Sequence, residues 1–415
     1  MQRREFLTAT GAVLVPRRTV GQSDRRTERR YHSPAVRQSD RPTLQEPSLA
    51  PEVFSRRLAR AQAELTTRKW DFLIATPSTT YRYFTGYNPG RSERLIALIV
   101  PAEGEPAIVC PSFEVDRIKQ HTSIADIEGW EEQSSPYKLV RRIVRARRPR
   151  PTGPIGLESS TNFDTYLALK DALSSWKLED AAPVTERLRI VKSPEEAQLI
   201  RRAIAITEDA MAATFARLAV GVSEQEVARL LASEMERRGA EGGAGGLVQF
   251  GASSALPHGG PAGVTLEREM VVLIDCGCRV AGYTSDITRT IWFGDHPSDE
   301  FRKVFNLVYD AQTAALLLGR PLLTQCQEMD RAARKIISDA GYGPQFTHRL
   351  GHGIGLDGHE PPYLVEGNAM RLEPGMVFTL EPGVYQPGKF GVRIEDNCVM
   401  TENGVELLSH RPAKH

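Results

Sequence analysis

Cysteine, net charge and long apolar runs are all scarce in this sequence. Five cysteines among 415 residues are few and odd in number, which argues against a disulfide framework. No uninterrupted apolar run approaches the roughly 18 residues that a membrane-spanning helix needs, so we expect no stable membrane span. With 40% hydrophobic and 25% charged residues, the composition is that of a globular chain long enough for roughly two or three domains.

The net charge of +1 hides an uneven distribution. Residues 1–50 contain ten arginines and no lysine against five acidic residues, which leaves the rest of the chain mildly acidic. This argues against a nucleic-acid-binding surface, because affinity for phosphate backbones comes mostly from clustered cations. The basic run 141–150 is interpreted as the end of a surface helix, since Val140, Ile143 and Val144 lie at helical spacing.

The N-terminus begins Met1-Gln2-Arg3-Arg4-Glu5-Phe6-Leu7 and continues with an apolar stretch to Val15, a pattern that resembles a twin-arginine export signal. The Ser/Arg/Asp-rich tract that follows contains no clear small-x-small cleavage site. We expect residues 1–50 to be a basic, disordered leader. Two locations stay open: export through a signal at residues 1–15, or otherwise the cytoplasm.

The remainder divides into two predicted domains. Between 51 and 190, short apolar runs such as 70–75 alternate with helical patterns, which is typical of an α/β layer with a mixed sheet. The pattern then breaks, and a long helix begins with Ser193 as its N-cap and Pro194 at its first position. We place the boundary near residue 190, so that the second domain covers 191–415.

Residues 270–293 read as a β-hairpin that carries two acidic residues. If the turn is centred between Val280 and Ala281, Asp275 and Asp286 stand directly opposite each other, with Cβ atoms roughly 5 Å apart. Acidic residues are poor strand formers and like charges repel, so such a pair calls for a compensating cation.

A second predicted hairpin, 376–400, repeats the arrangement. With its turn centred on Gly388, Glu381 and Glu395 are opposed. Two independent hairpins that each present an acidic pair are a far more specific pattern than a single Asp or Glu. A β-bulge in either hairpin would shift the register, but the residue types do not depend on it.

Three of the nine histidines, His348, His352 and His359, fall within twelve residues of a glycine-rich segment. Four carboxylates and one imidazole carry about four negative charges, which two divalent ions would neutralise. Such an oxygen-rich set with a single nitrogen suits manganese, and cobalt or zinc would also be accepted. Two ions roughly 3.5–4 Å apart are the arrangement of two-metal hydrolysis.

At this point the sequence resembles a known family. The order Asp275, Asp286, His352, Glu381 and Glu395, with the segments 350–356, 380–385 and 392–396, is similar to the pita-bread metallopeptidases, which include Xaa-Pro aminopeptidases, prolidases and methionine aminopeptidases. The segments 82–87 and 104–106 resemble the creatinase/prolidase accessory domain, which methionine aminopeptidases usually lack. The resemblance covers nearly all of 51–415. It implies an α/β creatinase/prolidase-like N-terminal domain followed by an α+β pita-bread catalytic domain.

The resemblance also implies roles for the five ligands. Asp286 and Glu395 match the carboxylates that bridge two ions, Asp275 a ligand of one ion, and His352 with Glu381 the ligands of the other. Glu381 is in addition the expected proton shuttle, because a general base must reach the attacking water.

Four further residues match the surroundings of that site. His258 and His359 correspond to the family's substrate-contacting histidines, which would donate to the peptide carbonyl and the oxyanion. Arg393 is expected to brace a metal ligand from outside, and His348 to line the same cleft.

Three functions remain open, and all concern proline-containing peptides or a related substrate. The leading expectation is a Xaa-Pro aminopeptidase, followed by a prolidase that cuts only Xaa-Pro dipeptides. Small prolidases carry an arginine four residues after the second histidine, where this sequence has Tyr363, although Arg349 or Arg371 could substitute. The third alternative is a creatinase-like C–N hydrolase or a non-catalytic binding relative, which typically loses metal ligands. A homodimer is expected because similar proteins are commonly dimers.

Overall fold

The computed structural model describes residues 49–260 and 262–415. The predicted leader at 1–50 and its twin-arginine signal therefore lie, but for two residues, outside the described residues. Within the described ranges, no helix has the length and apolar character required to cross a membrane.

The N-terminal part is an α/β layer, as predicted. Its helices are α1 (Pro51–Arg68), α2 (Thr79–Thr85), α3 (Val115–Lys119), α4 (Pro136–Arg147), α5 (Phe163–Ala172) and α6 (Ala182–Ile190). Its strands are β1 (Phe72–Ala75), β2 (Ala97–Pro101), β3 (Ala107–Pro111), β4 (Asp126–Trp130), β5 (Ile155–Leu157) and β6 (Leu178–Asp180). They form one sheet in the order β4-β3-β2-β1-β5-β6. β1–β2 and β2–β3 are antiparallel and the other pairs are parallel, so the predicted mixed sheet is confirmed.

The basic run at 141–150 contains the end of α4, where a surface helix was expected. Val140, Ile143 and Val144 are buried against the sheet, while the arginines on the other face are exposed or half-buried. Helix α4 therefore has the amphipathic pattern of an ordinary surface helix.

The C-terminal part contains the long helices. They are α7 (Pro194–Phe215), α8 (Glu224–Arg237), α9 (Asp299–Leu318) and α10 (Cys326–Asp339). Ser193 caps α7 and Ser223 caps α8, each accepting a hydrogen bond from the backbone N–H of a glutamate three residues later. That glutamate in turn accepts from the serine N–H, so both helices begin at a complete capping box.

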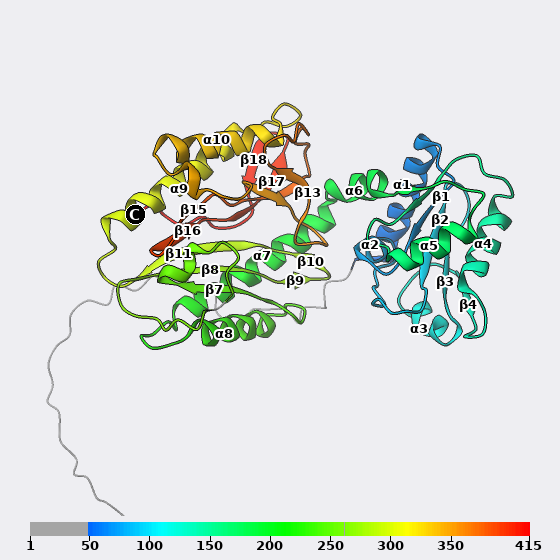
Figure 1. Ribbon diagram of the computed structural model, residues 1–415, viewed down its shortest axis with the longest axis horizontal. Coiled ribbons are helices and arrows are strands. Elements are labelled where there is room, and N and C mark those ends of the chain that lie inside the picture. Colours follow the sequence, from blue (N-terminus) through cyan, green and yellow to red (C-terminus); the bar gives the residue numbers. More distant parts are fainter. Residues whose placement is uncertain (1–48, 261) are drawn as a thin grey trace, which may run out of the picture. The chain divides into compact units, whose positions relative to one another are not determined.

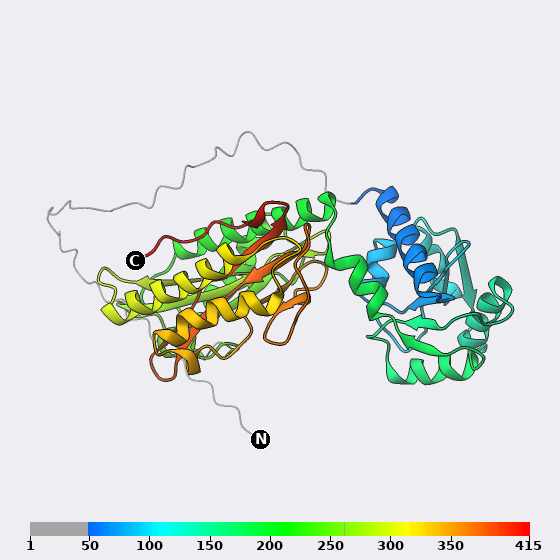
Figure 2. The ribbon, with the colours of Figure 1, turned by 90° about the horizontal axis from the view of Figure 1, so that it is seen from above.

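The strands of this part form a layered arrangement. They are β7 (Gly245–Phe250), β8 (Met270–Gly277), β9 (Arg279–Val280), β10 (Tyr283–Thr284), β11 (Ile287–Phe293), β12 (Gly351–Gly353), β13 (Glu360–Leu364), β14 (Val377–Leu380), β15 (Gly383–Gln386), β16 (Phe390–Arg393), β17 (Asp396–Thr401) and β18 (Gly404–Leu407). The main sheets have the orders β11-β8-β7 and β13-β12-β14-β17-β18. Helices α7 and α8 pack on the first set of strands and α9 and α10 on the second, so the strands lie between two helix pairs (Figures 1 and 2).

The register of the first hairpin differs from the prediction. Val280 pairs with Tyr283, so the turn is centred between Ala281 and Gly282 rather than one residue earlier. Both turn residues have positive φ, 49° and 85°, which is the backbone of the two-residue turn that suits twisted strands. Asp275 therefore faces Thr288, and its direct opposition to Asp286 is wrong. Because the residue that pairs with Asp275 changes by two positions, each side chain stays on the face of the sheet that was predicted for it.

The second hairpin has the predicted register. Leu380 pairs with Asp396 in one sheet and Gly383 with Arg393 in the next, and both pairs are centred on Gly388. Glu381 and Glu395 lie at the point where this β-ribbon passes from β14 and β17 to β15 and β16. Their backbones are thus at a break between two sheets, where side chains from neighbouring strands can converge.

Candidate metal centre

Three segments of the C-terminal part deliver the five predicted ligands. Asp275 comes from β8 and Asp286 from the residue pair just before β11. His352 is the middle residue of β12, while Glu381 and Glu395 flank the break described above. Residues more than 100 positions apart in sequence therefore meet because β12, β14 and β17 are neighbours in one sheet and β8 lies in the other.

The structure brings these five side chains together. The ligand atoms of Asp275, Asp286 and Glu395 all lie within 4.8 Å of one another, and so do those of His352, Glu381 and Glu395. His352 Nε2 is 3.3 Å from Glu381 Oε1, 3.8 Å from Asp286 Oδ2 and 4.0 Å from Glu395 Oε1. Two adjacent ligand groups that share Glu395 are the arrangement needed to hold two neighbouring ions.

The carboxylates of the cluster have too little positive charge near them to stay ionised without bound cations. Burial, followed by repulsion from neighbouring carboxylates, raises the pKa of Asp286 and Glu395 well above their ordinary values. Burial also raises the pKa of Glu381 to about 8. Such shifts are those of carboxylates with too little counter-charge, so the donor set fits hard or borderline divalent ions.

The hydrogen bond and the burial of the His352 side chain both favour its role as a metal ligand. Its Nδ1 lies 3.1 Å from the carbonyl oxygen of Gly353, so that Nδ1–H donates there and the Nε2 lone pair faces the carboxylates. Burial lowers the pKa of His352 to about 3, which keeps the imidazole neutral.

Arg393 holds the cluster from outside. Its Nη2 donates to Asp275 Oδ2 at 2.5 Å, its Nη1 to the Tyr385 hydroxyl at 2.7 Å, and its Nε to Thr288 Oγ1 at 3.0 Å. The Thr288 hydroxyl donates to Glu395 Oε2 at 2.7 Å. Sequence reasoning missed Thr288, and the correct hairpin register would have revealed it, since Thr288 stands opposite Asp275.

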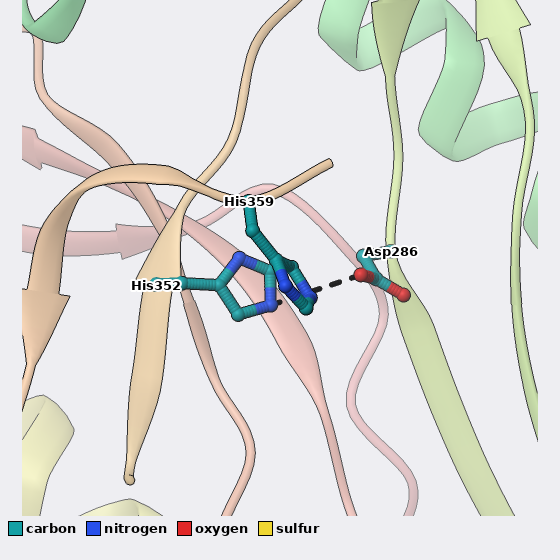
Figure 3. A group of neighbouring side chains, drawn as sticks. All are labelled: Asp286, His352 and His359. Atoms are coloured by element: carbon teal, nitrogen blue, oxygen red, sulfur yellow. Dashed lines mark ion pairs between the residues drawn. The ribbon is translucent and has the colours of Figure 1, made fainter. Parts of the chain in front are cut away.

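Two of the other predicted histidines, His348 and His359, lie beside the ligand cluster. His348 Nε2 is 2.8 Å from the Tyr385 hydroxyl. The rings of His352 and His359 have centroids 3.9 Å apart, and both lie across from Asp286 (Figure 3). Burial, and then the charges of Arg349 and His258, lower the pKa of the exposed His359.

The loop before β13 is held by buried charges. Glu360, which follows His359, accepts a hydrogen bond from Lys192 Nζ at 2.6 Å and contacts Arg189. Arg189 also donates to Asp357 in the same loop at 2.6 Å. Two cations from α6 and the residues after it therefore fix the position of His359.

The two arginines proposed as substitutes for a prolidase arginine have different surroundings. The guanidinium of Arg349 lies 4.5 Å from the centre of the Tyr363 ring and 3.4 Å from His359 Nδ1. Arg371 instead donates to the backbone carbonyls of Leu322 and Leu323. Of the two, Arg349 is the one beside the cluster.

Comparison with known proteins gives two family matches. Residues 198–402 match the metallopeptidase family M24, and residues 57–191 match the creatinase/prolidase N-terminal domain. The first match contains the whole ligand cluster.

Similar proteins include both kinds of proline-directed peptidase. The Xaa-Pro dipeptidase of Lactobacillus helveticus is 36% identical over 358 residues, which cover 85% of this chain and 96% of the relative. The crystal structure of dipeptidase PepE from Mycobacterium ulcerans has 34% identity and a TM-score of 0.82, over 88% of this chain and 98% of that one. The X-Pro aminopeptidase from Thermotoga maritima has 31% identity and a TM-score of 0.73, over 82% and 96%.

Proposed function

Because the chain belongs to the metallopeptidase family M24, we propose that it hydrolyses the bond between an N-terminal residue and proline, with two divalent ions bound at the ligand cluster. The observation that carries this proposal is the convergence of four carboxylates and one neutral imidazole. Asp286 and Glu395 would be shared by both ions, Asp275 would serve one, and His352 with Glu381 the other. The division into an accessory domain at 51–190 and a catalytic domain at 191–415 is part of the proposal.

The bound ions would supply Lewis acidity, polarising the scissile carbonyl and lowering the pKa of the attacking water. Glu381 accepts the proton of that water and delivers it to the proline nitrogen, which has no N–H and must be protonated to leave. His258 and His359 would donate to the carbonyl oxygen and stabilise its developing charge. Arg393 and Thr288 hold Asp275 and Glu395 in place.

Dipeptides are the first candidate substrate. The sequence favours an aminopeptidase because Tyr363 replaces an arginine, but the two relatives with the higher identities above are named dipeptidases. The Thermotoga maritima protein supports the second candidate, an aminopeptidase acting on longer peptides. The creatinase-like alternative is not supported, since all five ligands are present and close together.

Manganese is the proposed metal and a homodimer the proposed assembly. Purified protein would be stripped with chelator and reloaded with manganese, cobalt or zinc, and assayed with a Xaa-Pro dipeptide, a Xaa-Pro-Yaa-Zaa peptide and a Xaa-Ala control. We expect hydrolysis only before proline, only with metal, and fastest for the dipeptide.

Two variants test the role of Glu381 in the reaction. Glu381→Gln should abolish turnover, while Glu373→Gln, which alters an exposed ion pair with Arg187, should not. Equal activity of stripped and reloaded protein, or hydrolysis of Xaa-Ala as fast as Xaa-Pro, would contradict the proposal.

A further inference from the structure

The loop that carries His258 is held at both of its ends by one buried carboxylate. We call residues 251–260 and 262 the His258 loop; it follows strand β7, on which helix α8 packs (Figure 1). Glu224, the first residue of α8, accepts hydrogen bonds from the backbone N–H of Phe250 at 2.8 Å and of Ala262 at 2.6 Å. Glu224 is fully buried and forms no salt bridge with any described residue. A buried carboxylate without a cation depends on such charge-assisted hydrogen bonds, so it fixes the two ends of the loop.

A buried amide holds the middle of the loop. Gln249 lies in β7 and is fully buried. Its Nε2 is 2.8 Å from the carbonyl oxygen of Ser253, 2.9 Å from that of Leu256 and 3.1 Å from that of Gly259. A side-chain amide has two N–H donors, so it serves two of these three acceptors at a time. Since Leu256 and Gly259 stand on either side of His258, the amide holds the backbone before and after that residue.

The His258 loop also contacts the residues that support the ligand cluster. The carbonyl oxygen of Pro257, which directly precedes His258, accepts a hydrogen bond from Arg393 Nη1 at 3.4 Å. Through Nη2 the same guanidinium binds Asp275, which lies in the strand paired with β7. The His258 side chain is exposed, and its ring forms no hydrogen bond with the described residues. The position of the imidazole is therefore set by the backbone of the loop and by the groups that bind it.

The turn around Gly259 is packed closely against the amide of Gln249. A Cβ atom at Gly259 would lie 2.7 Å from the Leu256 Cβ and 3.0 Å from Gln249 Nε2. Glycine permits this close approach because it has no side chain. The contact between the loop and the amide is thus one that a single added methyl group would disturb.

We propose that Gln249 is a positioning residue, whose side-chain amide holds the His258 loop so that the His258 imidazole is presented to the peptide carbonyl, while Glu224 fixes the ends of the loop. This inference rests on the proposed function, in which His258 donates to that carbonyl. A displacement of about 1 Å at a reacting group can cost about a hundred-fold in rate. An amide that never touches the substrate can therefore control the rate through the histidine that does.

The test is a double-mutant cycle between Gln249→Met and His258→Ala in manganese-loaded protein, assayed with alanyl-proline and with an Ala-Pro-Yaa-Zaa peptide. Gln249→Met keeps the length of the side chain and removes both donors, and it should lower kcat by about ten- to a hundred-fold. Manganese affinity measured by calorimetry should stay at the wild-type value, because Gln249 is not a ligand. In the His258→Ala background the same substitution should change kcat by less than about two-fold.

Two further variants complete the experiment. Gln62→Met is the matched control, because the Gln62 amide also binds two backbone carbonyls, those of Pro101 and Gly104, but in the N-terminal part; it should keep the wild-type kcat. Gly259→Ala disturbs the same contact from the side of the loop, so it should lower kcat only where His258 is present. This variant decides the question if Gln249→Met does not fold.

The two hypotheses fail differently. If wild-type protein cleaves neither peptide, the proposed function is overturned, and this inference with it. If wild-type protein is active but the loop variants lower kcat equally with and without His258, Gln249 only stabilises the fold and this inference alone is wrong. An unchanged kcat in His258→Ala would also overturn the inference while leaving the proposed function in place.

Discussion

Metal-free protein should lose stability as the pH rises from about 6.5 to about 8. The pKa of Glu381 is raised from 4.5 to about 8 in the folded chain, so the folded state holds a proton that the unfolded state has already released. Stability then falls with increasing pH, because the unfolded state binds fewer protons. At about 1.36 kcal/mol per pH unit for one proton, the interval of about 1.5 units corresponds to a loss of about 2 kcal/mol.

The pH interval begins at 6.5 because, at lower pH, the buried histidines change the free energy of unfolding in the opposite direction. Burial lowers the pKa of His348 to about 4 and of His352 to about 3, from 6.5. Their contribution therefore makes stability rise with pH up to about 6.5 and is constant above it. Asp286 and Glu395, whose pKa values are also raised, add to the loss above that point.

Urea unfolding of chelator-treated protein at several pH values between 6.5 and 8 measures this loss directly. Glu381→Gln is the matched variant, since it keeps the shape of the side chain and removes its titration, and it should make the slope smaller by about the share of one proton. Saturating manganese should abolish the slope in the wild type by neutralising the cluster. A free energy of unfolding that is constant or rises over this interval in metal-free wild type would refute the reasoning.

Two other substitutions test which residues hold the metal ligands in place and which stabilise the fold. Arg393→Met removes the guanidinium that contacts Asp275, and we expect manganese affinity measured by calorimetry to fall by about ten- to a hundred-fold; unchanged affinity would contradict a bracing role. Ser193→Ala removes the N-cap of α7 and should lower the free energy of unfolding by about 1 kcal/mol in urea, while kcat stays at the wild-type value. Wild-type stability of this variant would show that the cap contributes nothing.

The fold class and the residue types of the site could be predicted from the sequence, but part of the geometry could not. The α/β N-terminal domain and the α+β pita-bread domain are confirmed by the family matches and the solved relatives. The turn of the first hairpin was predicted one residue too early. Ala281, a poor candidate for positive φ, forms this turn with Gly282. Strand β7 was not anticipated, since its first two residues are Gly245 and Gly246 and glycine is depleted in strands.

The error in the hairpin leaves the ligand set unchanged for a physical reason. A shift of two residues exchanges the direct neighbour of Asp275 from Asp286 to Thr288 but keeps every side chain on its own face. The cross-strand neighbour of Asp275 is therefore a residue with a neutral hydroxyl, which accepts from Arg393 and donates to Glu395. The observed register places the Thr288 hydroxyl as a hydrogen-bond donor beside the acidic cluster, which stabilises the Glu395 carboxylate while leaving other oxygens free for metal ions.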